Sequence, residues 1–152
     1  MAEMSPKIRF YDKEKLKNIN EETIKLYKKY KMDMSLRELS EGTISGYEND
    51  LQHWFIYIYD NQFNQCITEL NEDDITEFLY YCKTKGNNTE RMKRRMSTIS
   101  AFYKFLRKKR IIKENPMDFI DRPKKGVPII IQTFLTFLSK NSPIFYKWEM
   151  NC

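Results

Sequence analysis

The segment that decides the fold is residues 89–110, TERMKRRMSTISAFYKFLRKKR. Apolar side chains recur in it at three- and four-residue steps, the spacing of one face of an α-helix. These side chains are Met92, Met96, Ile99, Tyr103 and Leu106. Phe102 and Phe105 add a second apolar edge. The pattern therefore predicts a long helix, capped by Asn88, that is packed from two sides like the central helix of a bundle.

Further helices are predicted on both sides of this segment. Ser40 can cap a helix over about residues 41–60, because apolar side chains follow it at helical spacing from Ile44 to Ile58. Asn20 and Asn71 can cap two others, each with acids in its first turn, where negative charge suits the helix dipole. The helix after Asn20 is expected to be short, and Pro116 is expected to start a final helical turn.

Length and composition agree with one mostly helical domain. The chain has 152 residues, of which 41% are hydrophobic, and only four Gly and five Pro stand against ten Tyr and ten Phe. We expect a flexible arm over residues 1–18, a helical domain over 19–122, and a linker with a tail over 123–152, because DRPKKGVP (121–128) resembles an interdomain linker.

The sequence also predicts where the protein works. No run approaches about 18 apolar residues, and the first residues lack the apolar core of a secretion signal. The three cysteines, Cys66, Cys82 and Cys152, are odd in number and have no CxxC spacing. They are read as bystanders in a reduced, cytoplasmic setting, with no membrane partner.

The net charge of +6 is unevenly distributed. Residues 83–113 hold twelve Lys and Arg and one acid, Glu90, which gives +11, so the remainder of the chain sums to 6 − 11 = −5. A basic stripe on one long helix is typical of proteins that bind a phosphate backbone. The candidate phosphate-binding residues of this basic stretch include Lys85, Arg91 and Arg95.

A helical projection sharpens this prediction. One face of the 89–110 helix mixes cations with small hydroxyls, the mixture that a helix in a major groove uses for phosphates and base edges. This face consists of Lys93, Ser97, Ser100, Lys104 and Lys108. An ordinary solvated helix face, an acidic protein partner or an acidic lipid surface would present similar charges, so these readings stay open.

Two motifs resemble the core-binding domain of tyrosine recombinases, the phage-integrase family. The first is Thr43-x-x-x-Tyr47-x-x-Asp50-Leu51-x-x-x-Phe55, which is similar to that domain's opening helix. The second is RRMSTISAFYKFL (94–106), which is similar to its long helix. The Asn-Pro of IKENP (112–116) and the PKK of residues 123–125 resemble the end of the domain and the start of its linker.

The resemblance implies an all-α SAM-like bundle of four to five helices that covers one face of double-stranded DNA. By position it implies that Lys93, Arg94, Ser97, Ser100 and Lys104 face the groove, and that Thr43 is a weaker candidate for a phosphate contact. Ser100 departs from the family, since many members have Arg there. An intact recombinase is a further expected partner, and no small-molecule substrate is expected.

The chemistry of strand cleavage is not expected in this chain. The family's catalytic domain supplies two Arg, a Lys, a His-x-x-Arg stretch and a late Tyr, whereas this chain has one histidine, His53, followed by Trp54-Phe55-Ile56. Only 24 residues follow Pro128, which we expect to be too few for a catalytic domain, and residues 129–136 resemble the family's linker running into that domain. We therefore expect no catalytic residues, no metal site and no cofactor. Glu72, Asp73 and Asp74 are read as helix-dipole partners.

Three hypotheses follow. The first is a DNA-binding module: the core-binding part of a tyrosine site-specific recombinase or integrase, without cleavage activity. The second is a helical protein-interaction module whose basic helix meets an acidic partner. The third is an inactive, truncated integrase remnant.

Overall fold

The structure, a computed structural model, describes residues 13–123, and the chain divides into two units between Arg122 and Pro123. The described part is helical and contains no β-strand, which confirms the predicted all-α class. Its elements are α1 (Lys13–Lys17), α2 (Glu21–Leu36), α3 (Glu41–Asn61), α4 (Glu72–Thr84), α5 (Thr89–Lys108) and the 3-10 turns η1 (Ile67–Glu69) and η2 (Pro116–Phe119).

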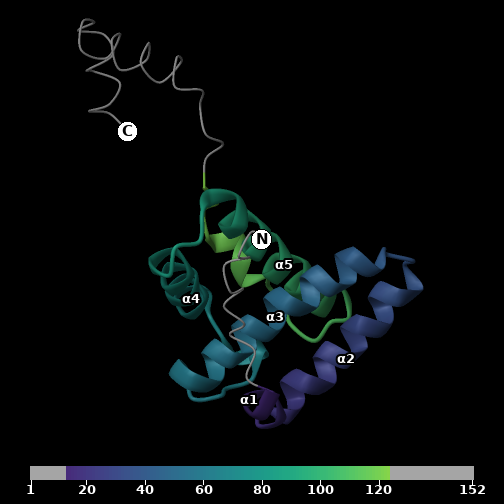
Figure 1. The fold of residues 1–152 in the computed structure, drawn as a ribbon. Coiled ribbons are helices and arrows are strands. Elements are labelled where there is room, and N and C mark those ends of the chain that lie inside the picture. Colours follow the sequence, from purple (N-terminus) through teal and green to yellow (C-terminus); the bar gives the residue numbers. More distant parts are fainter. Residues whose placement is uncertain (1–12, 124–152) are drawn as a thin grey trace, which may run out of the picture. The chain divides into compact units, whose positions relative to one another are not determined.

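Helix α5 is the centre of the bundle, as its two apolar edges predicted. It contacts α2, α3, α4 and η2, and Figure 1 shows α2 and α4 on opposite sides of α3 and α5. Phe102 packs against Tyr30 of α2 at a ring-centroid distance of 5.1 Å and against Phe55 of α3 at 6.2 Å. Tyr103 turns the other way, edge-on to Trp54, and its hydroxyl donates to the Ile67 carbonyl at 2.9 Å. Phe102 and Tyr103, neighbours in α5, thus pack against different parts of the core.

The predicted caps begin the helices where expected. The side chain of Asn20 accepts hydrogen bonds from the backbone of Glu22 and Thr23, and the side chains of Ser40 and Asn88 accept one each, from the amides of Thr43 and Arg91. Asn71 forms a reciprocal capping box with Asp74, so this one of the three acids serves the helix end. The caps matter for the site because Asn88 fixes the residue at which α5 starts.

The expected flexible arm over 1–18 is wrong for residues 13–17, which form α1. Leu16 packs against the core, and the Lys15 ammonium lies 2.8 Å from the Asp60 carboxylate. Asn64 fixes the chain just after α1, because its side chain accepts a hydrogen bond from the Asn20 amide and donates one to the Asn18 carbonyl. Five residues are too few for helical periodicity to appear in the sequence, and these contacts come from residues more than 40 positions away.

Helix α2 is longer than the short helix expected after Asn20. It continues to Leu36 because Met34, in its last turn, is fully buried in the core. The rest of the predicted arm, residues 1–12, and residues 124–152 of the predicted linker and tail lie outside the described residues, and Cys152 lies there too.

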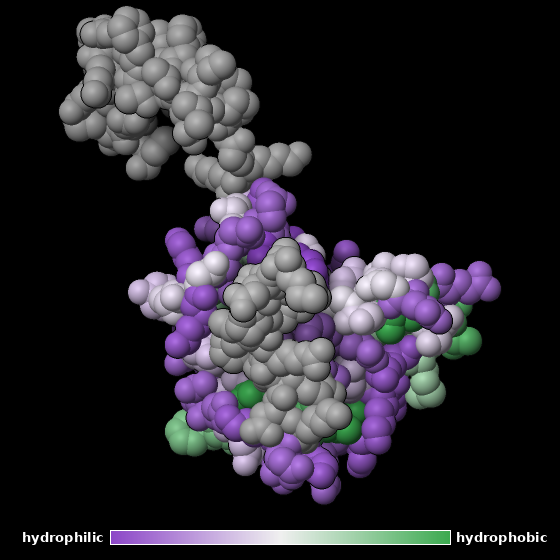
Figure 2. Space-filling model, viewed as in Figure 1, coloured by the Kyte–Doolittle hydropathy of each residue, from purple (hydrophilic) through white to green (hydrophobic). Residues whose placement is uncertain are grey.

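The surface of the helical unit is mainly hydrophilic. On the face seen in Figure 2, hydrophobic residues lie scattered among hydrophilic ones. The large exposed hydrophobic side chains are Met32, Leu36, Phe63, Tyr80, Ile111 and Phe119. None of the helices in the described range is long and apolar enough to cross a membrane.

Candidate nucleic-acid interface

The solvent-facing side of α5 presents the face that the sequence indicated. Ser97, Lys104 and Lys108 are exposed, while Lys93 and Ser100 are half-buried. Lys93 lies 3.5 Å from Glu90 on the same helix, a weak surface pair that leaves its charge available to a stronger anion. This side carries no bulky apolar side chain, because Met92, Met96 and Ile99 all turn into the core. A phosphate backbone could therefore approach the lysines of this side closely.

The chain after α5 folds back along this face. Asn115 is buried, and its side-chain amide donates to the Ser100 carbonyl at 3.2 Å. Its side-chain oxygen accepts from the Met117 amide and so caps the start of η2. Further along, the Arg122 guanidinium donates to the Ser97 hydroxyl at 2.8 Å. Arg122 thus adds a cation to the middle of the face, which periodicity could not reveal because it comes from outside the helix.

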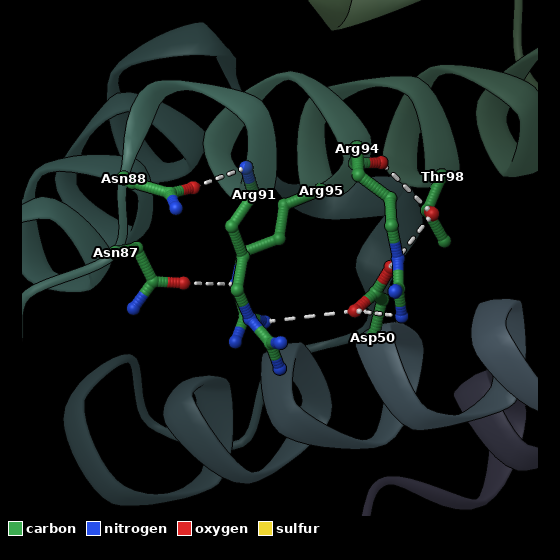
Figure 3. Close-up of polar contacts among 7 residues, drawn as sticks. All are labelled: Asp50, Asn87, Asn88, Arg91, Arg94, Arg95 and Thr98. Carbon is green, nitrogen blue, oxygen red and sulfur yellow. Dashed lines mark hydrogen bonds and ion pairs between the residues drawn. The ribbon is translucent and has the colours of Figure 1, made fainter.

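A buried carboxylate fixes the first half of α5 against α3. Asp50 is 2% exposed, and its Oδ2 accepts from Arg94 Nε at 3.1 Å and from the Thr98 hydroxyl at 3.0 Å (Figure 3). Its Oδ1 lies 3.4 Å from Arg94 Nη2 and 4.0 Å from Arg95 Nη1. Asp50 belongs to the first quoted motif, and its three partners belong to the second. One ion-pair cluster thus connects the two motifs, which lie far apart along the chain.

Arg94 and Arg95 differ sharply in position although they are neighbours in sequence. The Arg94 side chain is 49% exposed, so it can reach an external phosphate while it stays bonded to Asp50. The Arg95 side chain is only 5% exposed, and its Nε donates to the Asn87 side chain at 2.8 Å. Sequence reasoning placed Arg95 among the surface cations. The structure instead puts it inside, where it joins α5 to the end of α4.

The remaining candidates are not part of this face. Arg91 is exposed on the first turn of α5, and Lys85 is exposed, with its ammonium 5.5 Å from the centre of the Tyr81 ring. Thr43 is exposed on the first turn of α3, where its hydroxyl is 2.8 Å from that of Ser40, the cap of the same helix. The cap explains Thr43 locally, and a phosphate contact by Thr43 stays a prediction.

His53 is placed for packing. It lies on α3, half-buried, and burial together with the neighbouring Arg95 lowers its pKa to about 4. It is therefore neutral at physiological pH and cannot balance charge on a phosphate. Within residues 13–123, no group of three His, Cys, Asp or Glu side chains could hold a metal ion, and Cys66 and Cys82 are both buried with free thiols.

Because its pKa is depressed, His53 should make folding pH-dependent. Between pH 6.5 and about 4 the unfolded chain protonates this imidazole and the folded chain does not, so the free energy of unfolding should fall as the pH falls through this window. The His53→Gln variant should lose stability less steeply over the same range. His53 is the only histidine of the chain, so its single imidazole signal in an NMR titration reports the pKa directly. A midpoint near 6.5 would contradict the prediction.

This arrangement defines a class: a helical bundle whose central helix carries an exposed basic face. The family model described as "Phage integrase, N-terminal SAM-like domain" matches residues 24–110. The chain therefore belongs to the phage integrase family through this SAM-like domain.

The chain is also similar to curated tyrosine recombinases. It is 34% identical to tyrosine recombinase XerD of Oceanobacillus iheyensis over 89 residues, which are 59% of this chain and 30% of the relative. It is 30% identical to tyrosine recombinase XerC of Anoxybacillus flavithermus over 89 residues, 59% of this chain and 29% of the relative. A match to a tyrosine recombinase of Pseudothermotoga lettingae, 28% identical, covers 71% of this chain and 40% of that protein. The chain thus spans less than a third of the first two relatives. No solved structure matches it.

Proposed function

We propose that this helical unit binds double-stranded DNA as the core-binding part of a tyrosine site-specific recombinase or integrase. The observation that carries the proposal is the exposed side of α5, where lysines and small hydroxyls lie together without any bulky apolar group. Its lysines would contact backbone phosphates, and its serines would approach closely enough for polar contacts in the groove. The family relationship supports a recombinase-related role.

The rigidity of α5 supports groove binding over a loose electrostatic contact. Helix α5 is held on one side by the Asp50 cluster and on another by Asn115 and η2. A cationic face held at fixed geometry can follow one register of the duplex, because phosphate contacts position a protein while base contacts specify the sequence. The proposed contacts are Lys93, Arg94, Ser97, Ser100, Lys104, Lys108 and Arg122, with Arg91, Lys85 and Thr43 as further candidates.

Strand cleavage is not part of the proposed function. Cleavage by a tyrosine nucleophile needs cations around the reacting phosphate and a group that transfers a proton. The one histidine, His53, is neutral and half-buried against arginines, and Tyr103, beside the core tryptophan, has its pKa raised well above the usual value by burial. Incubation with duplex DNA should leave no covalent protein–DNA adduct on a denaturing gel. An intact recombinase at the same site is the partner that would supply this chemistry.

Salt dependence is the direct test of the proposed function. If about five to seven phosphates are contacted, the logarithm of the binding constant for duplex DNA should fall with the logarithm of salt concentration at a slope of about −4.5 to −6. Fluorescence anisotropy with labelled duplex at several salt concentrations measures this slope.

Two outcomes would overturn the proposal. Binding that does not change with salt rules out phosphate contacts, and absence of binding at low salt rules out the function altogether. Capture of an acidic protein partner that excess duplex DNA does not displace would instead favour the protein-interaction module.

A further inference from the structure

At the start of α5 the guanidinium groups of Arg94 and Arg95 lie at the Asp50 carboxylate, and Arg91 is an electrostatic neighbour of Arg95. Arg91, Arg94 and Arg95 project from the first two turns of α5 toward α3, where Asp50 lies (Figure 3). In this view the side chains of Arg91 and Arg95 overlap on one side of the carboxylate, and Arg94 lies on the other side. Like charges this close repel one another unless an anion lies between or beside them.

Arg95 has an unused donor in the middle of this group. Its Nη1 is buried and has no hydrogen-bond acceptor among the described residues. The nearest ion-pair partner, Asp50 Oδ1, is 4.0 Å away, which is beyond hydrogen-bond distance. Its Nε is already bonded to Asn87. Buried guanidinium nitrogens are normally satisfied, so this donor needs an acceptor, a water or an anion, that the described residues do not provide.

The group also carries excess positive charge. Guanidinium groups stay protonated in proteins, so Arg91, Arg94 and Arg95 contribute three charges. Asp50 contributes one negative charge. Burial raises the pKa of the Cys82 thiol, so this neighbour contributes no compensating negative charge at neutral pH, and His53, with a pKa of about 4, is neutral there. The positive end of the α5 helix dipole adds to the excess.

We propose that Arg91, Arg94 and Arg95 form a binding site for one phosphate-type oxyanion between α3 and α5. Arg95 supplies its unused Nη1 from inside, Arg94 supplies the part of its guanidinium that is exposed, and Arg91 closes the site from solvent. Asp50 serves as the positioning residue, because it pairs with both Arg94 and Arg95. The proposal rests on the proposed function in one respect: in the DNA complex, the oxyanion is a single backbone phosphate.

The anion site can be tested without DNA. We expect inorganic phosphate, added to the full chain at constant ionic strength, to raise the midpoint of thermal unfolding with a saturating concentration dependence. The Arg91→Gln variant should lose most of this rise, since Arg91 is exposed and its replacement leaves the core intact. The matched control Lys28→Gln removes one charge from the exposed side of α2 and should keep the full rise. General exclusion of phosphate from protein surfaces would raise all three midpoints alike and without saturation.

A second variant tests the buried donor. Arg95→Lys keeps the charge but removes the guanidinium nitrogens. It should fold with the same helical circular dichroism, and phosphate should raise its midpoint of thermal unfolding less than that of the unmodified chain. An unchanged response of Arg91→Gln, or no response of the unmodified chain beyond that to chloride, overturns the site.

The DNA arm separates this site from the proposed function. In duplex binding, Arg91→Gln should reduce the magnitude of the salt slope by about one, the value of a single phosphate contact, and Lys28→Gln should not change it. If DNA binds the unmodified chain and Arg91→Gln with equal slopes, and phosphate has no effect, the site is wrong and the proposed function stands. If phosphate stabilises the chain but duplex DNA does not bind, the site stands with free phosphate as its ligand, and the proposed function is wrong.

Discussion

Replacement of Asp50 by asparagine should lower the free energy of unfolding by about 3 to 5 kcal/mol. Asparagine keeps the size of the side chain and can still accept from the Thr98 hydroxyl, so the variant removes charge and little else. The loss arises from Arg95, whose side chain is 5% exposed and cannot reach water when its carboxylate partner is gone. Arg94 adds little because it is half-exposed and can turn outward. Urea denaturation followed by circular dichroism measures the difference.

Two companion variants separate charge pairing from packing. Arg94→Gln leaves Asp50 with Thr98 and Arg95, and because Arg94 is half-exposed this change should cost less than Asp50→Asn. Asp50→Asn combined with Arg95→Met removes both buried charges, and it should be more stable than Asp50→Asn alone, since the uncompensated guanidinium is gone. An Asp50→Asn variant within about 1 kcal/mol of the unmodified chain would contradict the view that this carboxylate holds α3 and α5 together.

The fold could be predicted from the sequence wherever one helix face was long enough to show its period. The apolar edges of α5 gave both its central place and its exposed side, and the caps at Asn20, Ser40, Asn71 and Asn88 marked where helices begin. The α1 helix was missed because its five residues show no period and its stability comes from distant contacts at Asp60 and Asn64.

The candidate site was harder to predict because charge alone does not tell where a side chain points. Arg94 and Arg95 look equivalent in the sequence, yet a step of about 100° around the helix puts one at the surface and the other inside. Asp50 offered a signal that sequence reasoning left unused: an acid beside Leu51 on the buried face of α3, four residues before Trp54. An acid at such a position needs a buried cation, and Arg95 was available. Arg122 carried no comparable signal, because its contact with Ser97 spans 25 residues.

Replacement of Lys93, Lys104 and Lys108 by glutamine should weaken duplex binding by about 500-fold at 0.1 M salt. Each phosphate contact contributes about 0.9 to the salt slope, so three contacts account for about 2.7 powers of ten between 1 M and 0.1 M salt. Stability should change little because Lys104 and Lys108 are exposed and the one ion pair of Lys93 is a weak surface pair. The matched control replaces Lys25, Lys28 and Lys29 of α2, which removes the same charge from another side of the bundle. If the exposed side of α5 binds the duplex, only the first variant loses affinity and slope together. Equal losses in both variants would mean that DNA responds to net charge, and the assignment of α5 as the DNA-binding helix would then be wrong.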